Sequence, residues 1–167
     1  LAFKFTNIEV KGEFEKYTVT INKGDGSNPI VREIQYGDPI GELPEAPEKA
    51  GHTFSKWVDG NGNEVTSETI VTGEITVTPE YTTNRATLTI THPEYINEGD
   101  LSGEYEYGTE ITLTAKEREG FTFSKWSNDS IDNPITITIG DDDITIEPIY
   151  NEDGPKTATF KDGRSIN

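Results

Sequence analysis

The 167-residue chain contains no cysteine and no methionine. Without cysteine, a disulfide framework and a cysteine-ligated zinc site are both excluded. A thiol nucleophile is excluded for the same reason. The serines are spread through turn-like segments, and no Gly-x-Ser-x-Gly nucleophile motif occurs. We therefore expect a protein that is not an enzyme and that holds no cofactor and no metal.

Basic residues are scarce as well. There are 14 lysines and arginines against 31 aspartates and glutamates, which gives a net charge of −17. Such a surface repels nucleic-acid phosphates and anionic lipid headgroups, so neither is expected as a partner. Long apolar runs are also missing, since none approaches the ~20 residues of a membrane-spanning helix. The charge is typical of a soluble protein with no membrane insertion.

What the sequence does contain is a repeated segment. Gly51-His52-Thr53-Phe54-Ser55-Lys56-Trp57 recurs as Gly120-Phe121-Thr122-Phe123-Ser124-Lys125-Trp126, and these two copies hold both tryptophans. Pro79-Glu80-Tyr81 recurs in step as Pro148-Ile149-Tyr150. The copies are 69 residues apart at both landmarks (57 to 126 and 81 to 150). A fixed period of this kind indicates tandem structural repeats.

The repeated aromatic residues are predicted to anchor two hydrophobic cores. Within each copy the Phe and the Trp are three residues apart, and a regular strand would place them on opposite faces. Either the strand is covered on both faces, or a bulge turns the Trp inward. A Trp that stacks on a ligand is the alternative to a core anchor. The predicted anchors are Phe54, Trp57, Phe123 and Trp126, with Tyr36, Tyr81, Tyr107 and Tyr150.

Alternation of apolar residues with threonine predicts strands throughout, and hence a β-dominant α+β fold. The predicted organisation is two whole units, 16–83 and 84–152, with the end of a preceding unit at 1–15 and the start of a following one at 153–167. The closing strands are expected to pair with each other, 65–71 with 75–81 and 134–139 with 144–146. Thr157 to Phe160 is expected to open the following unit.

One short helical turn is predicted near 39–43. Asp38 suits a helix N-cap and Pro39 suits the first helical position. Pro44 and Pro47 prevent a longer helix. The corresponding part of the second copy, 111–115, has no proline and alternates regularly, so a strand is expected there.

Two acidic segments carry residues of the kind that bind calcium. Asp141-Asp142-Asp143 with Glu147 could offer several oxygen ligands, but the first copy has Thr72-Gly73-Glu74 there, and a plain hairpin turn is favoured. Asp59-x-Asn61-x-Asn63 begins like a calcium loop. Glu64 stands where that loop needs glycine, and Ile70 where it needs an acid. A hairpin loop is therefore expected at 59–63.

The first copy resembles the Listeria–Bacteroides repeat, or internalin B-type repeat, and the second resembles its divergent form. The matching motifs of the first copy are Tyr17-Thr18-Val19-Thr20, Gly24 to Gly26, Tyr36-Gly37, Pro44 to Pro47, 51–57 and 75–81. Those of the second are Tyr107-Gly108, Leu113-Thr114-Ala115, 120–126 and 144–150. The departures from the family pattern are His52 for tyrosine and Lys56 for glycine.

The resemblance implies two small β-grasp-like units and an extracellular setting at the bacterial cell surface, in adhesins or internalin-like virulence factors. It carries over no catalytic residue. The hypothesis is a non-catalytic stalk or spacer that assists adhesion, with neighbouring repeats as partners. The alternatives are a module that binds a glycan or a protein of a host or neighbouring cell, and a phage fibre or decoration segment. Ligand contacts would then come from loops 22–29 and 59–63, with Asn61 and Asn63.

Overall fold

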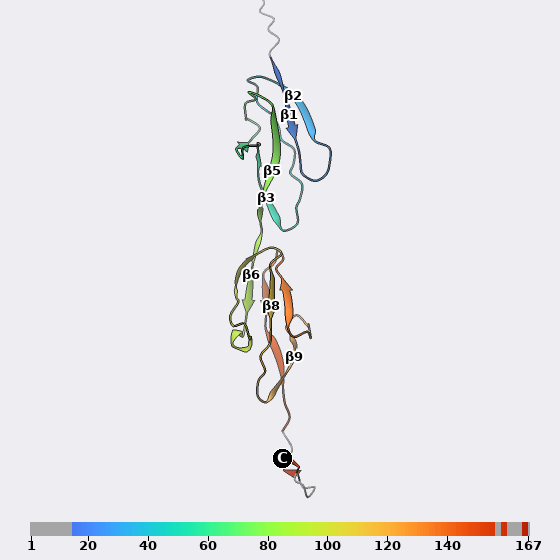
Figure 1. Ribbon diagram of the computed structural model, residues 1–167, viewed down its shortest axis with the longest axis vertical. Coiled ribbons are helices and arrows are strands. Elements are labelled where there is room, and N and C mark those ends of the chain that lie inside the picture. Colours follow the sequence, from blue (N-terminus) through green and yellow to red (C-terminus); the bar gives the residue numbers. More distant parts are fainter. Residues whose placement is uncertain (1–14, 156–157, 160–164, 167) are drawn as a thin grey trace, which may run out of the picture. The chain divides into compact units, whose positions relative to one another are not determined.

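The computed structural model describes residues 15–155, 158–159 and 165–166, and the chain divides into two compact units between Thr82 and Thr83 (Figure 1). Strands dominate both units, which confirms the β-dominant prediction. Within the described ranges, helix is limited to a single 3-10 turn, Pro93–Tyr95. Predictions for the preceding unit, residues 1–14, lie outside the described residues.

Unit one is a five-stranded mixed sheet in the order β2-β1-β5-β3-β4. The strands are β1 (Lys16–Ile21), β2 (Ile30–Gln35), β3 (His52–Val58), β4 (Glu64–Val65) and β5 (Ile75–Thr83). β1 and β2 form an antiparallel hairpin, while β5 lies parallel to β1. The inward positions of the central strands, Val19, Ile21 and Val77, are completely buried. The period-2 alternation of these strands therefore does point one face into the core.

The predicted pairing of the closing strands is wrong in both units. In unit one, only Val65 of the predicted segment 65–71 belongs to a strand, β4, and that strand pairs with β3. β5 instead pairs in parallel with β1, and in unit two β11 (Ile144–Ile146) pairs in parallel with β6 (Arg85–Ile90). Antiparallel neighbours can be joined by a short turn, whereas parallel strands need a long crossover that leaves no local signal.

The helical turn predicted at 39–43 is also wrong, because no residue of this segment is helical and Gly41 takes a positive φ of 78°. Pro39 bridges Ile70, and backbone hydrogen bonds run from Val71 N to Asp38 O (2.9 Å) and from Ile40 N to Thr69 O (2.8 Å). Ile40 is buried in the core of unit one. A single helical turn is unfavourable to nucleate, so pairing with the distant chain and burial of Ile40 decide the conformation.

Unit two is built from three small sheets, ordered β11-β6-β7, β10-β8 and β12-β9. Its remaining strands are β7 (Gly103–Glu106), β8 (Glu110–Leu113), β9 (Phe121–Trp126), β10 (Ile135–Thr138) and β12 (Pro148–Glu152). The strand predicted at 111–115 is confirmed by β8. β13 (Ala158–Thr159) pairs with β14 (Ser165–Ile166), while Thr157 and Phe160 of the predicted opening strand lie outside the described residues.

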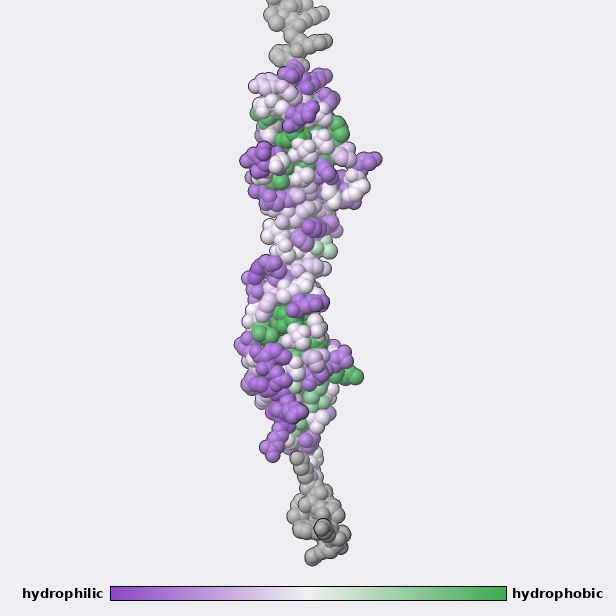
Figure 2. All heavy atoms as spheres, viewed as in Figure 1, coloured by the Kyte–Doolittle hydropathy of each residue, from purple (hydrophilic) through white to green (hydrophobic). Residues whose placement is uncertain are grey.

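Each unit encloses its own hydrophobic core, and no polar or charged side chain of the described residues is buried. Trp57 belongs to the core of unit one and Trp126 to that of unit two. On β9, the register with β12 shifts between Lys125, opposite Ile149, and Phe123, opposite Tyr150. This bulge turns Trp126 inward. Figure 2 shows hydrophobic residues only as small patches on an otherwise hydrophilic face of each unit.

Candidate functional site

The loop at 59–63 is closed on itself by Asp59. The Asp59 carboxylate accepts hydrogen bonds from the backbone N–H groups of Asn61 and Asn63, both at 2.9 Å, and from the Asn63 side-chain amide at 3.0 Å. These bonds, those of Asn63 first, lower the pKa of Asp59. The loop joins β3 to β4 as the predicted hairpin. The Asn63 side-chain amide is thus engaged within the loop. A ligand role for Asn61 and Asn63 stays a prediction.

The loop at 22–29 is organised in the same manner. Asn22 accepts the N–H of Gly24 at 2.9 Å, and Asp25 accepts the N–H of Ser27 at 2.9 Å. The hydroxyl and N–H of Ser27, together with Lys23 at 3.3 Å, lower the pKa of Asp25 to about 2. The polar groups of this loop hold its own turns.

The low pKa of Asp25 predicts that its contribution to stability depends on pH. Its folded-state pKa of about 2 lies below the ordinary value of about 3.9. The ionised carboxylate therefore contributes stability above pH ~4, and this contribution is lost as the pH falls toward 2. We expect Asp25→Asn to melt below the parent at pH 7, and the difference to shrink as the pH falls through about 2 and to vanish below it. A difference in melting temperature that stays constant over this range would contradict the assignment.

The acidic residues at 141–143 serve the fold of unit two. Asp141 accepts the Asn84 side-chain amide at 2.6 Å, and Asp143 accepts the N–H of Thr87 at 2.7 Å. The loop that carries them joins β10 to β11, which pair with different strands, so the predicted hairpin turn is wrong in this detail. In the described part of the chain, no three His, Asp or Glu side chains gather as a metal site.

A polar arrangement that the sequence reasoning missed is repeated in the two units. The Tyr81 hydroxyl donates to the carbonyl of Pro47 at 2.6 Å, and the Tyr150 hydroxyl donates to that of Lys116 at 2.7 Å. A cation lies over each tyrosine ring, Lys49 Nζ at 5.5 Å from the Tyr81 centroid and Arg118 Cζ at 4.8 Å from that of Tyr150. The signal was available, because 49 and 118 are also 69 residues apart.

The arrangement is more elaborate in unit two. The Arg118 guanidinium carbon lies 3.8 Å from the ring centroid of Tyr95 and 4.4 Å from that of Phe121. Tyr95 in turn packs edge-on against Tyr150, with centroids 6.0 Å apart. In unit one His52 occupies the position of Phe121, and Lys49 lies over Tyr81 alone among the described rings. The two units therefore share a cation and a tyrosine, but only unit two surrounds its cation with three rings.

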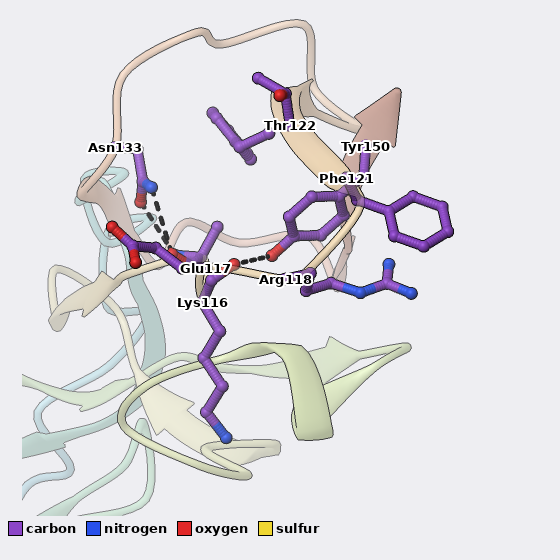
Figure 3. Close-up of a pocket in the computed structure, with 9 residues that line it drawn as sticks. Lys116, Glu117, Arg118, Phe121, Thr122, Asn133 and Tyr150 are labelled. Carbon is purple, nitrogen blue, oxygen red and sulfur yellow. Dashed lines mark hydrogen bonds between the residues drawn. The ribbon is translucent and has the colours of Figure 1, made fainter. Parts of the chain in front are cut away.

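A pocket adjoins the cation in each unit. The pocket of unit two has a volume of about 340 Å³, and Figure 3 shows its lining from 115–118, 121–123, Asn133 and Tyr150. Asn133 is tied to Ala115 by two hydrogen bonds, from Ala115 N (2.8 Å) and to Ala115 O (3.2 Å). The pocket of unit one, about 410 Å³, is lined by the loop at 22–25, by 47–49, by 78–79 and by Tyr81.

The predicted anchors fall into three groups, which are buried, half-buried and exposed. Trp57 and Trp126 are buried, with 6% and 0% of their surface exposed. Phe123, Tyr81 and Tyr150 are half-buried. Phe54 and Phe123 each touch the Trp and the Tyr of their own unit, with centroids 5.6–6.0 Å apart. The other three are not core residues: Tyr36, Phe54 and Tyr107 are exposed. Tyr36 lies at the surface against Tyr17, with ring centroids 6.3 Å apart.

Comparison with protein families covers both units. Residues 17–78 match the Listeria-Bacteroides repeat domain, and residues 87–164 match the divergent InlB B-repeat domain. These matches confirm the resemblance inferred from the motifs. The second match extends beyond residue 152, where the second unit was predicted to end; the predicted unit boundaries stay predictions. Neither family indicates an enzymatic activity.

Two curated proteins of Evansella cellulosilytica are similar over most of the chain. One, named "Putative membrane protein", is 26% identical over 152 residues, which is 81% of this chain and 22% of that protein. The other, named "Putative Gly-rich membrane protein", is 28% identical over 127 residues, 72% of this chain and 14% of that protein. The chain thus spans about a fifth or less of these relatives. No solved structure matches it significantly. Among the described residues, no helix is long and apolar enough to cross a membrane.

Proposed function

We propose that this chain, a Listeria-Bacteroides repeat domain followed by a divergent InlB B-repeat domain, is a non-catalytic spacer within a longer bacterial cell-surface protein. Repeat domains of these families are typical of bacterial surface proteins, and the two relatives carry membrane-protein names. An extracellular position for this chain, and a role in projecting an adhesive part of the parent protein, belong to the proposal.

The observation that carries the proposal is that each unit closes a core of its own from apolar side chains. The core of unit one contains Val19, Ile21 and Trp57, and that of unit two contains Leu88, Leu113 and Trp126. No charged or polar side chain of the described residues is buried. Buried titratable groups are the usual mark of a catalytic site. Because each such unit buries its own apolar side chains, further units can be added along a chain without another protein to cover them.

We further propose that both units are β-grasp-like. The support is the strand order β2-β1-β5-β3-β4 of unit one, with an antiparallel first hairpin and a parallel pairing of the first and last strands. Unit two repeats the antiparallel β6–β7 hairpin, the parallel β6–β11 pairing and the antiparallel β9–β12 pairing. Unit one has the matching neighbours, since β3 lies beside β5 in its sheet, and this repetition supports one shared design.

The spacer proposal is tested in the full-length parent protein on its own cell. Residues 16–152 are replaced by two unrelated β-sandwich domains of similar length, and in a second strain they are deleted. Adhesion to host cells and surface accessibility of a terminal tag are measured. We expect the replacement to keep adhesion and the deletion to reduce it. Loss of adhesion in the replacement strain, with the tag still accessible, would show that attachment to the host cell comes from these units themselves. A gene neighbourhood of phage tail genes would favour the fibre alternative.

A further inference from the structure

We propose that Arg118 forms an oxyanion-binding site in unit two, which takes the carboxylate or phosphate groups of an anionic glycan. The proposal goes beyond the spacer function, because a spacer needs no ligand site. It starts from the guanidinium, which lies over the rings of Tyr95, Phe121 and Tyr150 with its carbon 3.8, 4.4 and 4.8 Å from their centroids.

The rings hold the guanidinium and leave its donors available. Aromatic faces attract a guanidinium and fix its plane. In the described part of the chain, the Arg118 side chain makes no salt bridge and donates no hydrogen bond. A guanidinium carries five N–H donors in a rigid fork that matches the two oxygens of a carboxylate or phosphate. Arg118 is therefore a preorganised cation. Its N–H groups are available to solvent or to a bound ligand, since no described residue accepts a hydrogen bond from them.

The adjoining pocket has room for one sugar residue and presents few competing polar groups. Its volume is about 340 Å³, at the lower end of the range for small-molecule sites. Three of its other polar side chains are engaged within the unit: Asn133 with Ala115, Thr122 with Asp153 at 2.6 Å, and Tyr150 with Lys116. The Glu117 carboxylate also lines the pocket. Lys116 points away from Arg118 in Figure 3 and donates to the carbonyl of Glu94 at 3.0 Å.

The aromatic lining favours a sugar-borne anion over an acidic peptide. The pocket is lined by Phe121, Phe123 and Tyr150 beside Arg118, and 37% of the Phe121 surface is exposed. An apolar ring face next to a cation suits a sugar, which has an apolar face of C–H groups and a charged substituent at its edge. An extended acidic peptide offers carboxylates but no apolar face that would pack against the aromatic rings.

The acidic surroundings set how such binding should depend on salt. The chain carries a net charge of −17, and the Glu117 carboxylate lines the pocket. The pKa of Glu94 is lowered first by a hydrogen bond from the Glu94 backbone N–H, then by His92, and last by the positive charge of Arg118. These charges repel a polyanion over distance, and salt screens that repulsion. A fork contact at Arg118 is screened less, so binding should persist at physiological salt.

Unit one supplies a matched control. Lys49 holds the position of Arg118, but it lies 5.5 Å from one ring only and its ammonium has no planar fork. His52 replaces Phe121 there. If charge alone mattered, both positions would bind alike; if the ring-held fork matters, only Arg118 should.

The experiment titrates the ¹⁵N-labelled 167-residue chain at 150 mM salt and follows backbone amides and the Arg118 side-chain N–H by NMR. The probes are polygalacturonate for carboxylate, a phosphomannan for phosphate, fully methyl-esterified polygalacturonate as the neutral control, and poly-glutamate as the acidic peptide. We expect saturable shifts around 115–123 with at least one anionic glycan and none with the neutral one. Whichever glycan binds identifies carboxylate or phosphate as the group recognised.

The variants decide whether the site is at Arg118. Arg118→Gln should weaken binding about tenfold or more, since charge-assisted hydrogen bonds are lost. Arg118→Lys keeps a cation over the rings and should give an intermediate loss, and Lys49→Gln should change nothing. The amide spectra of all three report whether the fold persists. Absence of binding to both anionic glycans, equal losses at Lys49 and Arg118, undiminished binding by Arg118→Gln, or equally strong binding of poly-glutamate would each overturn the proposal.

Discussion

Replacing Trp126 by alanine should destabilise unit two by about 3–5 kcal/mol, the usual loss for a large buried aromatic side chain. Trp126 is completely buried within a core that also contains Leu88, Leu113 and Ile139. Its indole N–H donates to the carbonyl of Asp132 at 2.8 Å. The alanine variant therefore leaves both a cavity and an acceptor without its donor. A loss of this size is a large share of the stability of a small domain.

Trp126→Phe separates the two contributions. Phenylalanine fills much of the volume but cannot donate to Asp132, and the lost hydrogen bond is worth about 0.5–1.5 kcal/mol. We expect a loss between that of the alanine variant and zero. Urea unfolding followed by far-ultraviolet circular dichroism measures both variants without relying on tryptophan fluorescence. An alanine variant with the unfolding midpoint of the parent would contradict the burial of Trp126.

Replacing Trp57 by alanine should cost unit one a similar amount, about 3–5 kcal/mol. Trp57 packs with Val19, Ile21 and Val77, which are completely buried. Unlike Trp126, its indole N–H has no hydrogen-bond partner among the described residues. Trp57→Phe should therefore cost less than Trp126→Phe, although the two tryptophans occupy matching positions.

Phe54→Ala is the control for this variant. The Phe54 ring touches Trp57 and Tyr81 but is 38% exposed. Its removal should cost clearly less than removal of Trp57, because less apolar surface returns to water. The same urea titration measures both. Equal losses would mean that the exposed ring is as much a part of the core as the tryptophan, and a parent-like Trp57→Ala would revive a ligand-stacking role for that residue.

The repeated tryptophans and the repeated cations have different roles in the two units. The repeated tryptophans serve the core of each unit, which is what a spacer requires. The repeated cation at 49 and 118 lies at the surface, where it contributes little to the core. Unit two has elaborated it with Tyr95 and Phe121, so a spacer could carry one binding unit among units that only extend it.

Local pattern by itself determined the strands and the repeat. Threonine alternating with apolar residues gives one buried and one exposed face, and this predicted β1, β6 and β8 correctly. The hairpin at 59–63 followed from its glycines and asparagines. The 69-residue period identified the two repeats, and their motifs carried the resemblance to the two families that match. Each of these signals lies within a few residues of the structure it predicts, or in the direct comparison of two copies.

Only the tertiary structure decided which strands pair and where the chain's cations lie. The parallel pairings of β5 with β1 and of β11 with β6 join segments more than fifty residues apart. No short turn connects these strands, so local sequence does not specify which residues pair. The same long-range pairing holds 38–40 extended against 69–71, where local preference favoured a helical turn. Arg118 meets Tyr95 and Tyr150 only because β9, β12 and the turn at 93–95 converge in unit two. Contacts between residues far apart in sequence depend on the whole fold, so short-range pattern could predict the elements but not the site.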